Sequence, residues 1–419
     1  MQKVNNNVSS TNRLQALKEF DILDTLPEEE YEDIITLVKC ICKTPIVLIS
    51  FIDETRNWFK AKVGIDADHS PSEISFCRHT ILQNGIFEVE DTLKDDRFAT
   101  NPMVTGDLNI RFYAGYPISV GEGYNLGSLC VGDTSPNKLT DEQKNALIAL
   151  AKQVANQLYL RKKTKEINHL NTQLTENLEY SELLQKSMLN FNASENLLRE
   201  SFKNFETLNL PKAKVSGDFF VSIKVKNNLF LLLVDCAGHG VSAGLSSIAY
   251  FSTINRIIIN ESITDIEKIA HRINELSHDY QNLRTKKLNN SSAMTIVKMD
   301  FELKKIDCLG IQQSILIKTK TGEIVNIKFN STPLNYDLKN ATYTKQTYNF
   351  DEITRMVLYT DGIIDQKGGS ENKKLGTQNF INWVSEKTSA NNYYTNKLKN
   401  WMGSNDEQID DILILDLTI

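Results

Sequence analysis

The sequence of 419 residues has no apolar run near the roughly 18 residues that a membrane-spanning helix needs. Its first residues, MQKVNNNVSSTNR, also lack the apolar core of a secretion signal. Positive charge is in deficit, because 47 Lys and Arg stand against 53 Asp and Glu, and the basic residues are dispersed. We therefore expect no membrane span, no nucleic-acid binding and a cytoplasmic location.

Cysteine is scarce and has no pattern. The chain has six cysteines, and Cys40 and Cys42 are the only close pair. Zinc sites need repeated short spacings that this set lacks, and disulfide frameworks are typical of small secreted domains. The cysteines therefore indicate a protein of a reducing compartment.

Four aspartates lie at the edges of strand-like apolar runs in the C-terminal half, at Asp218, Asp235, Asp361 and Asp410. Carboxylates that a fold gathers together repel one another and lose hydration, so such clusters normally bind cations that offset the charge. Hard oxygen ligands suit Mg²⁺ or Mn²⁺. The sequence therefore predicts a site for two divalent cations.

The stretch VSGDFFVSIKVKNNLFLLLVDCAGHG predicts a β-hairpin with its turn at Asn227-Asn228. Pairing Lys226 with Leu229 brings Asp218 within two residues of the position opposite Asp235. At about 3.3 Å per strand residue, this offset is compatible with a metal pair roughly 3.5–4 Å apart. The other two aspartates must come from distant strands.

Each aspartate also has an ordinary interpretation. Asp361 precedes Gly362, as turn aspartates often do, and the pair Asp410-Asp411 could simply be solvated. The motifs GDFF, DxxGHG, TDG and DD nevertheless follow one another in order, each at the edge of an apolar run. This ordered set favours one shared metal site over four unrelated turns.

With these motifs, the C-terminal half resembles the PPM metal-dependent serine/threonine phosphatases, in the SpoIIE-like branch that regulates sigma factors. The similarity spans about residues 180 to 419 and includes LLQKSMLNF, LNLPKAKVSGDFF, VDCAGHGVSAGLSS, SSAMTIVKMD, TPLNYD, LYTDGIID and DDILIL. The resemblance implies an αββα sandwich, in which two antiparallel sheets pack together and the acidic cluster lies at one end. The implied substrate is a phosphorylated anti-sigma antagonist or a similar partner-switching protein.

The resemblance also implies ligand roles for two Mn²⁺ or Mg²⁺ ions. Asp235 would bridge both ions, Asp218, Asp361 and Asp410 would complete the coordination shells, and the backbone carbonyl of Cys236 would be a further ligand. Such a pair of ions activates water directly, so no protein nucleophile is needed. This agrees with a chain that has no Cys-x₅-Arg loop.

His239 is the histidine of the DxxGHG motif. It could protonate the leaving seryl or threonyl oxygen, as a general acid does. Gly-His-Gly is more typical of a tight turn, however, and a helix is expected to begin near Val241. The turn interpretation is the one we favour.

Residues 12 to 162 have a different pattern of amphipathic helices and strands, and they resemble a GAF domain. The stretches SFCRHTIL, VEDTLKDDRFATNPMV, IRFYAGYPI and LGSLCVGD carry the similarity. It implies a central antiparallel sheet with helices on one side and a pocket on the other. Many such domains bind cyclic nucleotides, small metabolites or chromophores, and some bind nothing, so a small-molecule ligand remains an open expectation.

Cys77 and His79 of this module raise the possibility of a chromophore or redox site, since a reactive thiol near a histidine can serve either purpose. Arg78 separates the two residues, whereas bilin-attaching domains usually have them adjacent. A buried structural cysteine is the commoner case. We therefore expect a structural role for Cys77.

A polar segment with apolar residues at Ile167, Leu170, Leu174 and Leu178 predicts a helical coiled-coil linker over residues 163 to 199. The helix could lie on one domain, but such stripes between sensor and output modules more often pair in a parallel homodimer.

The predicted plan is a two-domain α+β protein with the phosphatase domain at 200 to 419. The rival function is a catalytically silent dimeric scaffold that binds its partner through this domain.

Overall fold

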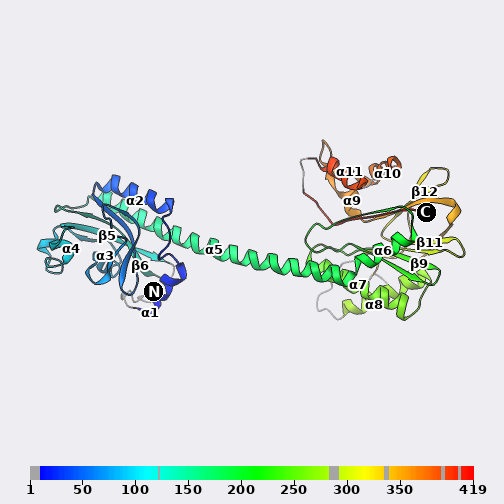
Figure 1. Cartoon of the computed structure of the whole chain (residues 1–419), viewed down its shortest axis with the longest axis horizontal. Coiled ribbons are helices and arrows are strands. Elements are labelled where there is room, and N and C mark those ends of the chain that lie inside the picture. Colours follow the sequence, from blue (N-terminus) through cyan, green and yellow to red (C-terminus); the bar gives the residue numbers. More distant parts are fainter. Residues whose placement is uncertain (1–9, 121–122, 283–291, 335–338, 388–391, 404–406) are drawn as a thin grey trace. The chain divides into compact units, whose positions relative to one another are not determined.

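The computed structural model describes residues 10–120, 123–282, 292–334, 339–387, 392–403 and 407–419. The chain divides into two compact units, of which the first ends at Thr172 and the second begins at Gln173. Each unit mixes helices with antiparallel sheets (Figure 1). The predicted α+β class with two domains is confirmed.

The first unit is built on one six-stranded antiparallel sheet with the order β3-β2-β1-β6-β5-β4. Its strands are β1 (Ile46–Ile52), β2 (Arg56–Val63), β3 (His69–Pro71), β4 (Phe87–Val89), β5 (Phe112–Val120) and β6 (Tyr124–Asp133). Its helices are α1 (Thr11–Phe20), α2 (Glu29–Cys42), α3 (Phe76–Thr80) and α4 (Pro102–Thr105), followed by the start of the long helix α5 (Asp141–Leu189).

Both faces of this sheet are covered. On one face, α1, α2 and α5 bury a core, to which α5 contributes Leu147, Ala151, Val154 and Leu158 at the three- and four-residue spacing of one helix face. On the other face, α3 and α4 enclose a second core that includes Cys77 and Cys130. This second face is where the family resemblance places a ligand pocket.

Beyond its packed first part, α5 continues with exposed apolar side chains. Ile167, Leu170 and Leu174 are 55%, 62% and 57% exposed. The helix ends at Leu189, Asn190 takes a left-handed conformation, and α6 (Phe191–Ser201) follows. The predicted linker therefore consists of the second half of α5 and the whole of α6.

The second unit is an αββα sandwich of two five-stranded antiparallel sheets, with the orders β14-β11-β10-β9-β8 and β13-β12-β15-β18-β7. The first sheet contains β8 (Phe219–Val225), β9 (Asn228–Asp235), β10 (Ala293–Asp300), β11 (Lys305–Ile311) and β14 (Gln346–Asn349). The second contains β7 (Phe205–Leu210), β12 (Ile315–Thr319), β13 (Ile324–Ile327), β15 (Ile353–Tyr359) and β18 (Ile412–Thr418).

Helices cover the outer faces of this sandwich (Figure 1). α7 (Val241–Asn255) and α8 (Ile266–Asn282), joined by a π-helical turn (Arg256–Asn260), pack on the first sheet. α9 (Asp361–Asp365), α10 (Gly376–Glu386) and α11 (Tyr393–Met402) pack on the second, beside the small hairpin β16 (Lys367–Gly368) and β17 (Lys373–Lys374). The inner faces of both sheets share one apolar core, which defines the sandwich.

The hairpin that precedes the candidate site has a different register from the predicted one. Val225 pairs with Asn228, so the turn consists of Lys226 and Asn227, and the predicted pairing of Lys226 with Leu229 is wrong. The physical reason is that Lys226 adopts the left-handed backbone, with a φ of 54°. Phe219 then pairs with Val234, which leaves Asp218 and Asp235 at the same end of the two strands.

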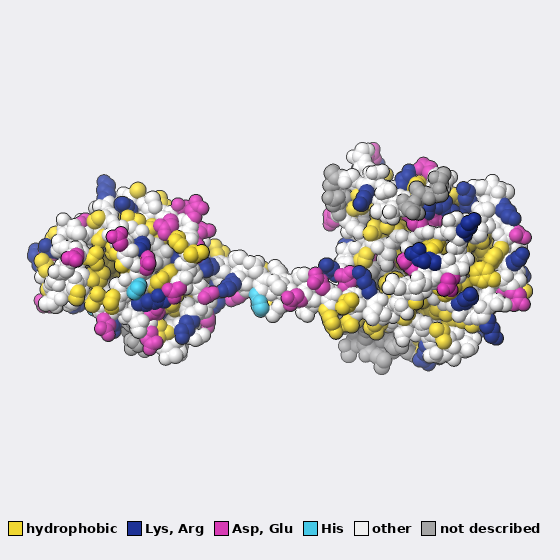
Figure 2. Space-filling view, viewed as in Figure 1, with side chains coloured by type: hydrophobic (Ala, Val, Ile, Leu, Met, Phe, Trp, Pro, Cys, Tyr) yellow, Lys and Arg dark blue, Asp and Glu magenta, His cyan; other side chains and the backbone are white. Residues whose placement is uncertain are grey.

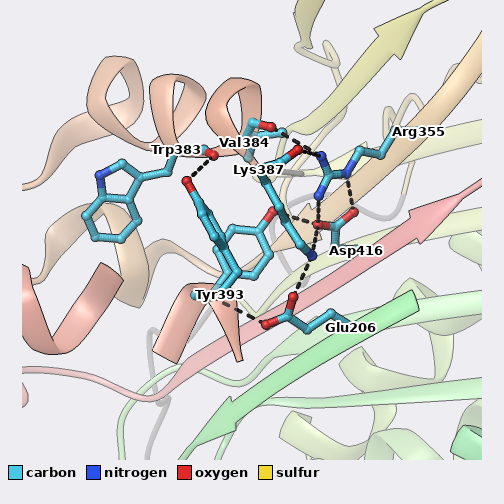
Figure 3. Close-up of polar contacts among 8 residues, drawn as sticks. Glu206, Arg355, Trp383, Val384, Lys387, Tyr393 and Asp416 are labelled. Carbon is cyan, nitrogen blue, oxygen red and sulfur yellow. Dashed lines mark hydrogen bonds and ion pairs between the residues drawn. The ribbon is translucent and has the colours of Figure 1, made fainter. Parts of the chain in front are cut away.

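A buried network of charges fastens the outer helices to the second sheet (Figure 3). Asp416 of β18 accepts hydrogen bonds from Arg355 at 2.7 and 2.6 Å, from Lys387 at 2.8 Å and from the Tyr394 hydroxyl at 2.7 Å. Lys387 also pairs with Glu206 of β7 at 2.5 Å. Strands β7, β15 and β18 are thereby joined to the segment between α10 and α11.

The surface carries charges of both signs. Lys and Arg side chains are interspersed with Asp and Glu on the face that Figure 2 shows. Among the helices of the described residues, none is both long and apolar enough to cross a bilayer.

Candidate metal centre

The four aspartates of the sequence motifs lie at strand ends in the second unit. Asp218 directly precedes β8 and Asp235 ends β9, both in the first sheet. Asp361 follows β15 and begins α9, and Asp410 lies just before β18, both in the second sheet. The charges of Asp361 and Asp410 act on Asp235, and the charge of Asp235 acts on Asp218, so carboxylates of the two sheets lie near one another at one edge of the sandwich.

Burial and the neighbouring aspartates raise the pKa values of three acids in the cluster. Burial, followed by the charge of Asp361, raises the pKa of Asp235 to about 7. Burial and the charge of Asp235 raise the pKa of Asp218 well above its usual value, and burial and the charge of Asp410 raise the pKa of Asp361. The ionised forms of these three carboxylates are therefore disfavoured, and either a proton or a cation would relieve this.

One oxygen of this cluster has no protein partner. Asp218 is 3% exposed, and its Oδ2 atom is buried without a hydrogen bond. Native proteins rarely leave such an atom unsatisfied, and an ion is a common reason for an exception. The acids therefore fit divalent cations in charge and in donor type.

The arrangement is not a closed coordination shell. Within the described ranges, no three His, Cys, Asp or Glu side chains are placed so that they could hold a metal ion together. The aspartates therefore influence one another electrostatically, but their side chains do not surround a single position for an ion. The individual ligand assignments to Asp218, Asp235, Asp361 and Asp410 stay predictions.

The backbone carbonyl of Cys236 lies beside the cluster, where Gly217 approaches it. A Cβ atom on residue 217 would lie 2.8 Å from the Cys236 oxygen, closer than real Cβ contacts allow. Glycine at this position therefore lets the loop that carries Asp218 pack against the strand end that carries Asp235. The Cys236 thiol is buried, and burial raises its pKa well above the usual value, which agrees with a backbone role only.

Asp411 has a role that the sequence did not reveal. It is 2% exposed, and its carboxylate accepts hydrogen bonds from the backbone N–H groups of Lys212 and Gly217, both at 2.7 Å. Asp411 therefore fixes the loop that carries Asp218, whereas the half-buried Asp410 accepts from the Asp411 N–H at 2.9 Å. No signal in the DD motif separates the structural acid from the candidate ligand.

Gln185 of α5 is a second residue that sequence reasoning missed. Its side chain is buried and hydrogen-bonds to both backbone groups of Ser216, and its Nε2 atom also donates to the Ser247 hydroxyl at 2.8 Å. The hydroxyl of Ser216 in turn accepts from the Asp218 N–H at 3.1 Å. The LLQKSMLNF motif contains this glutamine, but nothing in the motif indicates the contact.

His239 lies in the turn between β9 and α7. Gly238 and Gly240 flank it with φ values of 91° and 75°, and the His239 side chain is exposed. L-residues rarely adopt such φ values, so both glycines are needed for the turn. This geometry agrees with the turn interpretation of the Gly-His-Gly motif.

Two family models match the chain. The model described as Stage II sporulation protein E (SpoIIE) matches residues 226–419, and the GAF domain model matches residues 26–158. The motif-based resemblance is confirmed: the chain carries an N-terminal GAF domain and a C-terminal SpoIIE-type domain.

One solved structure supports the sandwich fold, and a second shows a weaker similarity. The SiaA-PP2C domain of Pseudomonas aeruginosa is 21% identical and superposes with a TM-score of 0.52, covering 60% of this chain and 98% of that one. The PP2C phosphatase domain of SpoIIE from Bacillus subtilis, solved with a fragment of its regulatory domain, is 14% identical with a TM-score of 0.42, over 52% of this chain and 61% of that one.

A curated relative matches a shorter part of the chain. The cyclic di-GMP phosphodiesterase PA2567 of Pseudomonas aeruginosa is 43% identical over 127 residues, which is 30% of this chain. The chain therefore spans only 22% of the length of that relative.

Proposed function

We propose that this chain is a divalent-cation-dependent protein phosphatase that acts on phosphoserine or phosphothreonine and is regulated by its GAF domain. One observation carries the proposal: the unpartnered buried Oδ2 atom of Asp218 lies among carboxylates whose pKa values are raised. Only a proton or a cation offsets the repulsion and lost hydration of these clustered carboxylates. The presence of all four aspartates in a PP2C-like fold favours the cation.

The ligands would be Asp218, Asp235, Asp361 and Asp410, with the backbone carbonyl of Cys236. Asp235 is the candidate bridging ligand, because it interacts with both Asp218 and Asp361. Two Mn²⁺ or Mg²⁺ ions would supply an activated water and polarise the phosphoryl oxygens. The protein positions the ligands from outside the cluster, through the contacts of Asp411 and Gln185 with the loop before β8.

The substrate in this proposal is a phosphorylated anti-sigma antagonist or a similar cytoplasmic signalling protein. The functional unit is a parallel homodimer in which the exposed apolar residues of α5 pair, since they recur at three- and four-residue spacing along one stripe. A small-molecule ligand of the GAF domain is one candidate for the regulatory signal.

A catalytically silent dimeric scaffold is the competing function, and one observation favours it: the described acids do not form a closed metal-binding group. Turnover separates the two proposals. Hydrolysis of p-nitrophenyl phosphate and of phosphopeptides is measured with Mn²⁺, with a chelator, and with the variant Asp235→Asn. Asp351→Asn is the matched control, because Asp351 has an 88% exposed side chain and lies apart from the cluster.

If the chain is a metal-dependent phosphatase, turnover is lost with the chelator and in the Asp235→Asn variant, and it is kept in the Asp351→Asn variant. Turnover that survives both treatments contradicts the metal mechanism. A wild-type chain that is inactive with Mn²⁺ and with Mg²⁺, in the presence and absence of chelator, supports the scaffold instead.

A further inference from the structure

Two cysteines that are distant in the sequence touch inside the GAF domain. Cys77 lies on α3 and Cys130 on β6, and their Sγ atoms are 3.6 Å apart. Both residues are buried, with exposed fractions of 3% and 2%. The two thiols share a hydrogen bond, and the Tyr113 hydroxyl also contacts the Cys77 sulfur.

We propose that Cys77 and Cys130 form an oxidant-sensing dithiol, which a peroxide converts into a disulfide. A disulfide has an S–S distance of about 2.05 Å, so the two sulfur atoms must approach by roughly 1.5 Å. β6 is held on both sides, because Cys130 pairs with Leu48 of β1 and with Gly115 of β5. α3 has only five residues and therefore is the element that can move.

The polar surroundings make the two sulfurs unequal. The Tyr113 hydroxyl donates a hydrogen bond to the Cys77 sulfur at 3.5 Å and is itself bonded to the Thr80 hydroxyl at 2.6 Å. The hydrogen bond from Cys130 lowers the pKa of Cys77 to about 5, while the same contact and burial raise the pKa of Cys130 well above its usual value. Because the Cys77 sulfur accepts from the Tyr113 hydroxyl, we assign Cys77 as the nucleophile and Cys130 as the resolving thiol.

The space beside the sulfurs suits a very small molecule. A void of about 20 Å³ is lined by Cys77, Cys130, Tyr113, Asn57 and Ser75 together with apolar side chains. Roughly 10–15 Å³ is enough for one water, and hydrogen peroxide is only slightly larger, whereas pockets for organic ligands typically measure about 300–1,000 Å³. This void therefore admits a peroxide and is far too small for a nucleotide.

Aromatic rings explain why the void is so small. Phe76 packs against Phe98 with ring centroids 4.5 Å apart and against Tyr113 at 5.1 Å. Phe87 lies 6.1 Å from Phe98 and 6.0 Å from Tyr113. The four rings fill the side of the sheet where a GAF ligand was expected, and they shield the dithiol from larger oxidants.

The reaction balances in two steps. The Cys77 thiolate attacks one oxygen of hydrogen peroxide, the O–O bond breaks, and a sulfenic acid and hydroxide form. The Cys130 sulfur then attacks the Cys77 sulfur, the S–O bond breaks, the thiol proton neutralises the hydroxide, and water leaves. The proton that Cys77 lost on ionisation neutralises the hydroxide of the first step. The two thiols therefore lose two electrons in total, and one peroxide becomes two water molecules.

The proposal gives Cys77 a role beyond the structural one expected from the sequence, which its burial also fits. Arg78 separates Cys77 from His79 in the sequence, and the His79 ring stacks on Phe87 and meets Phe98 in a T-shaped contact. The reactive partner is Cys130, which lies 53 residues away in the chain. Only the folded chain brings the two residues together.

The test uses the full-length chain, treated with hydrogen peroxide, alkylated with N-ethylmaleimide and mapped by mass spectrometry. We expect a peptide pair linked through Cys77 and Cys130, with the loss of two of the six thiols and their recovery after dithiothreitol. Exposed Cys40 is the internal reference for nonspecific oxidation. The proposal is overturned if Cys40 is oxidised while Cys77 and Cys130 remain free thiols.

Two variants sharpen this test. Cys77→Ser is expected to abolish the bridge and lower the rate of peroxide-dependent thiol loss at Cys130 to that of the other buried cysteines. Cys308→Ser, at a fully buried position on β11, is the matched control and should keep the bridge. A bridge lost equally in both variants contradicts the assignment, and the wild-type peptide map decides the question if a variant does not fold.

Discussion

Gln185 and Ser216 are joined by a pair of hydrogen bonds. The Gln185 Oε1 atom accepts from the Ser216 N–H at 3.1 Å, and its Nε2 atom donates to the Ser216 carbonyl oxygen at 2.5 Å. Asp218 lies two residues further along, with its N–H bonded to the Ser216 hydroxyl. The C-terminal part of α5 is therefore in direct contact with the loop that positions a candidate ligand.

The variant Gln185→Ala tests this contact. It leaves both backbone groups of Ser216 without their partner and loosens the loop that carries Asp218. We expect the affinity for Mn²⁺ to fall roughly 10-fold, as is common when a residue that orients a ligand is removed. Titration calorimetry measures the affinity, and Lys186→Ala on the exposed side of the same helix turn is the control, since Lys186 pairs only with Glu182. Unchanged affinity in Gln185→Ala contradicts a positioning role.

The adjacent acids Asp410 and Asp411 should respond in opposite ways to substitution. Asp411→Asn places an amide group against two N–H donors, and we expect it to lower the free energy of unfolding by about 1–3 kcal/mol. Asp410→Asn removes a like charge from the cluster, so it should keep the stability and lose the turnover. Chemical denaturation and a phosphatase assay on both variants check this, and equal loss of stability in the two would show that the roles are not divided.

The metal-free domain should become more stable when one carboxylate of the cluster is neutralised. Burial and the charge of Asp235 raise the pKa of Asp218, which means that its ionised form is unfavourable in the folded chain. Asp218→Asn is therefore expected to raise the unfolding temperature in the presence of chelator and to abolish the further rise on adding Mn²⁺. Thermal unfolding with and without Mn²⁺ measures both effects. A Mn²⁺-dependent rise that persists in Asp218→Asn would exclude this residue as a ligand.

Strand patterns predicted the strand-end positions of the acids, and the family resemblance that the motifs carry implied the two domains and the sandwich. The contacts that organise the site could not be predicted, because they join residues far apart in sequence: Gln185 to Ser216 across 31 positions and Asp411 to Gly217 across 194. Such contacts depend on how the elements pack and leave no local signal. The predicted hairpin register was wrong for a local reason. Lys226 adopts the left-handed conformation, for which asparagine is the usual residue.

The exposed stripe on α5 gives a prediction about assembly. Ile167 and Leu174 are seven residues apart, as in a heptad repeat, and more than half of each side chain is exposed. The double variant Ile167→Glu with Leu174→Glu should convert the proposed dimer into a monomer, because it places like charges in the seam. Sedimentation velocity measures the mass, with Leu303→Glu as a control at a position that is 67% exposed outside the helix. A wild-type chain that is monomeric at every concentration contradicts the dimer.

The buried network around Asp416 predicts a specific acid sensitivity (Figure 3). Burial alone would raise the pKa of Asp416, but the hydrogen bonds and charges of Arg355 and Lys387 outweigh it, so the pKa lies below its ordinary value of 3.8. The unfolded chain therefore binds the proton more readily than the folded chain. The stability that the Asp416 carboxylate contributes is therefore fully present at pH values above the ordinary pKa of 3.8. It is lost as the pH falls through the lower pKa of the folded state.

Asp416→Asn should remove both this stability and its pH dependence. The substitution leaves Arg355 and Lys387 buried without their shared partner, although Lys387 keeps its ion pair with Glu206, and we expect a loss of about 3–5 kcal/mol near neutral pH. In acid, where wild-type Asp416 is itself protonated, the difference between the two proteins should shrink. Denaturant unfolding at several pH values measures this, with Asp351→Asn as the exposed control. A difference that stays constant down to strongly acidic pH would show that the packing of Asp416, and not its charge, holds α10 and α11 on the sheet.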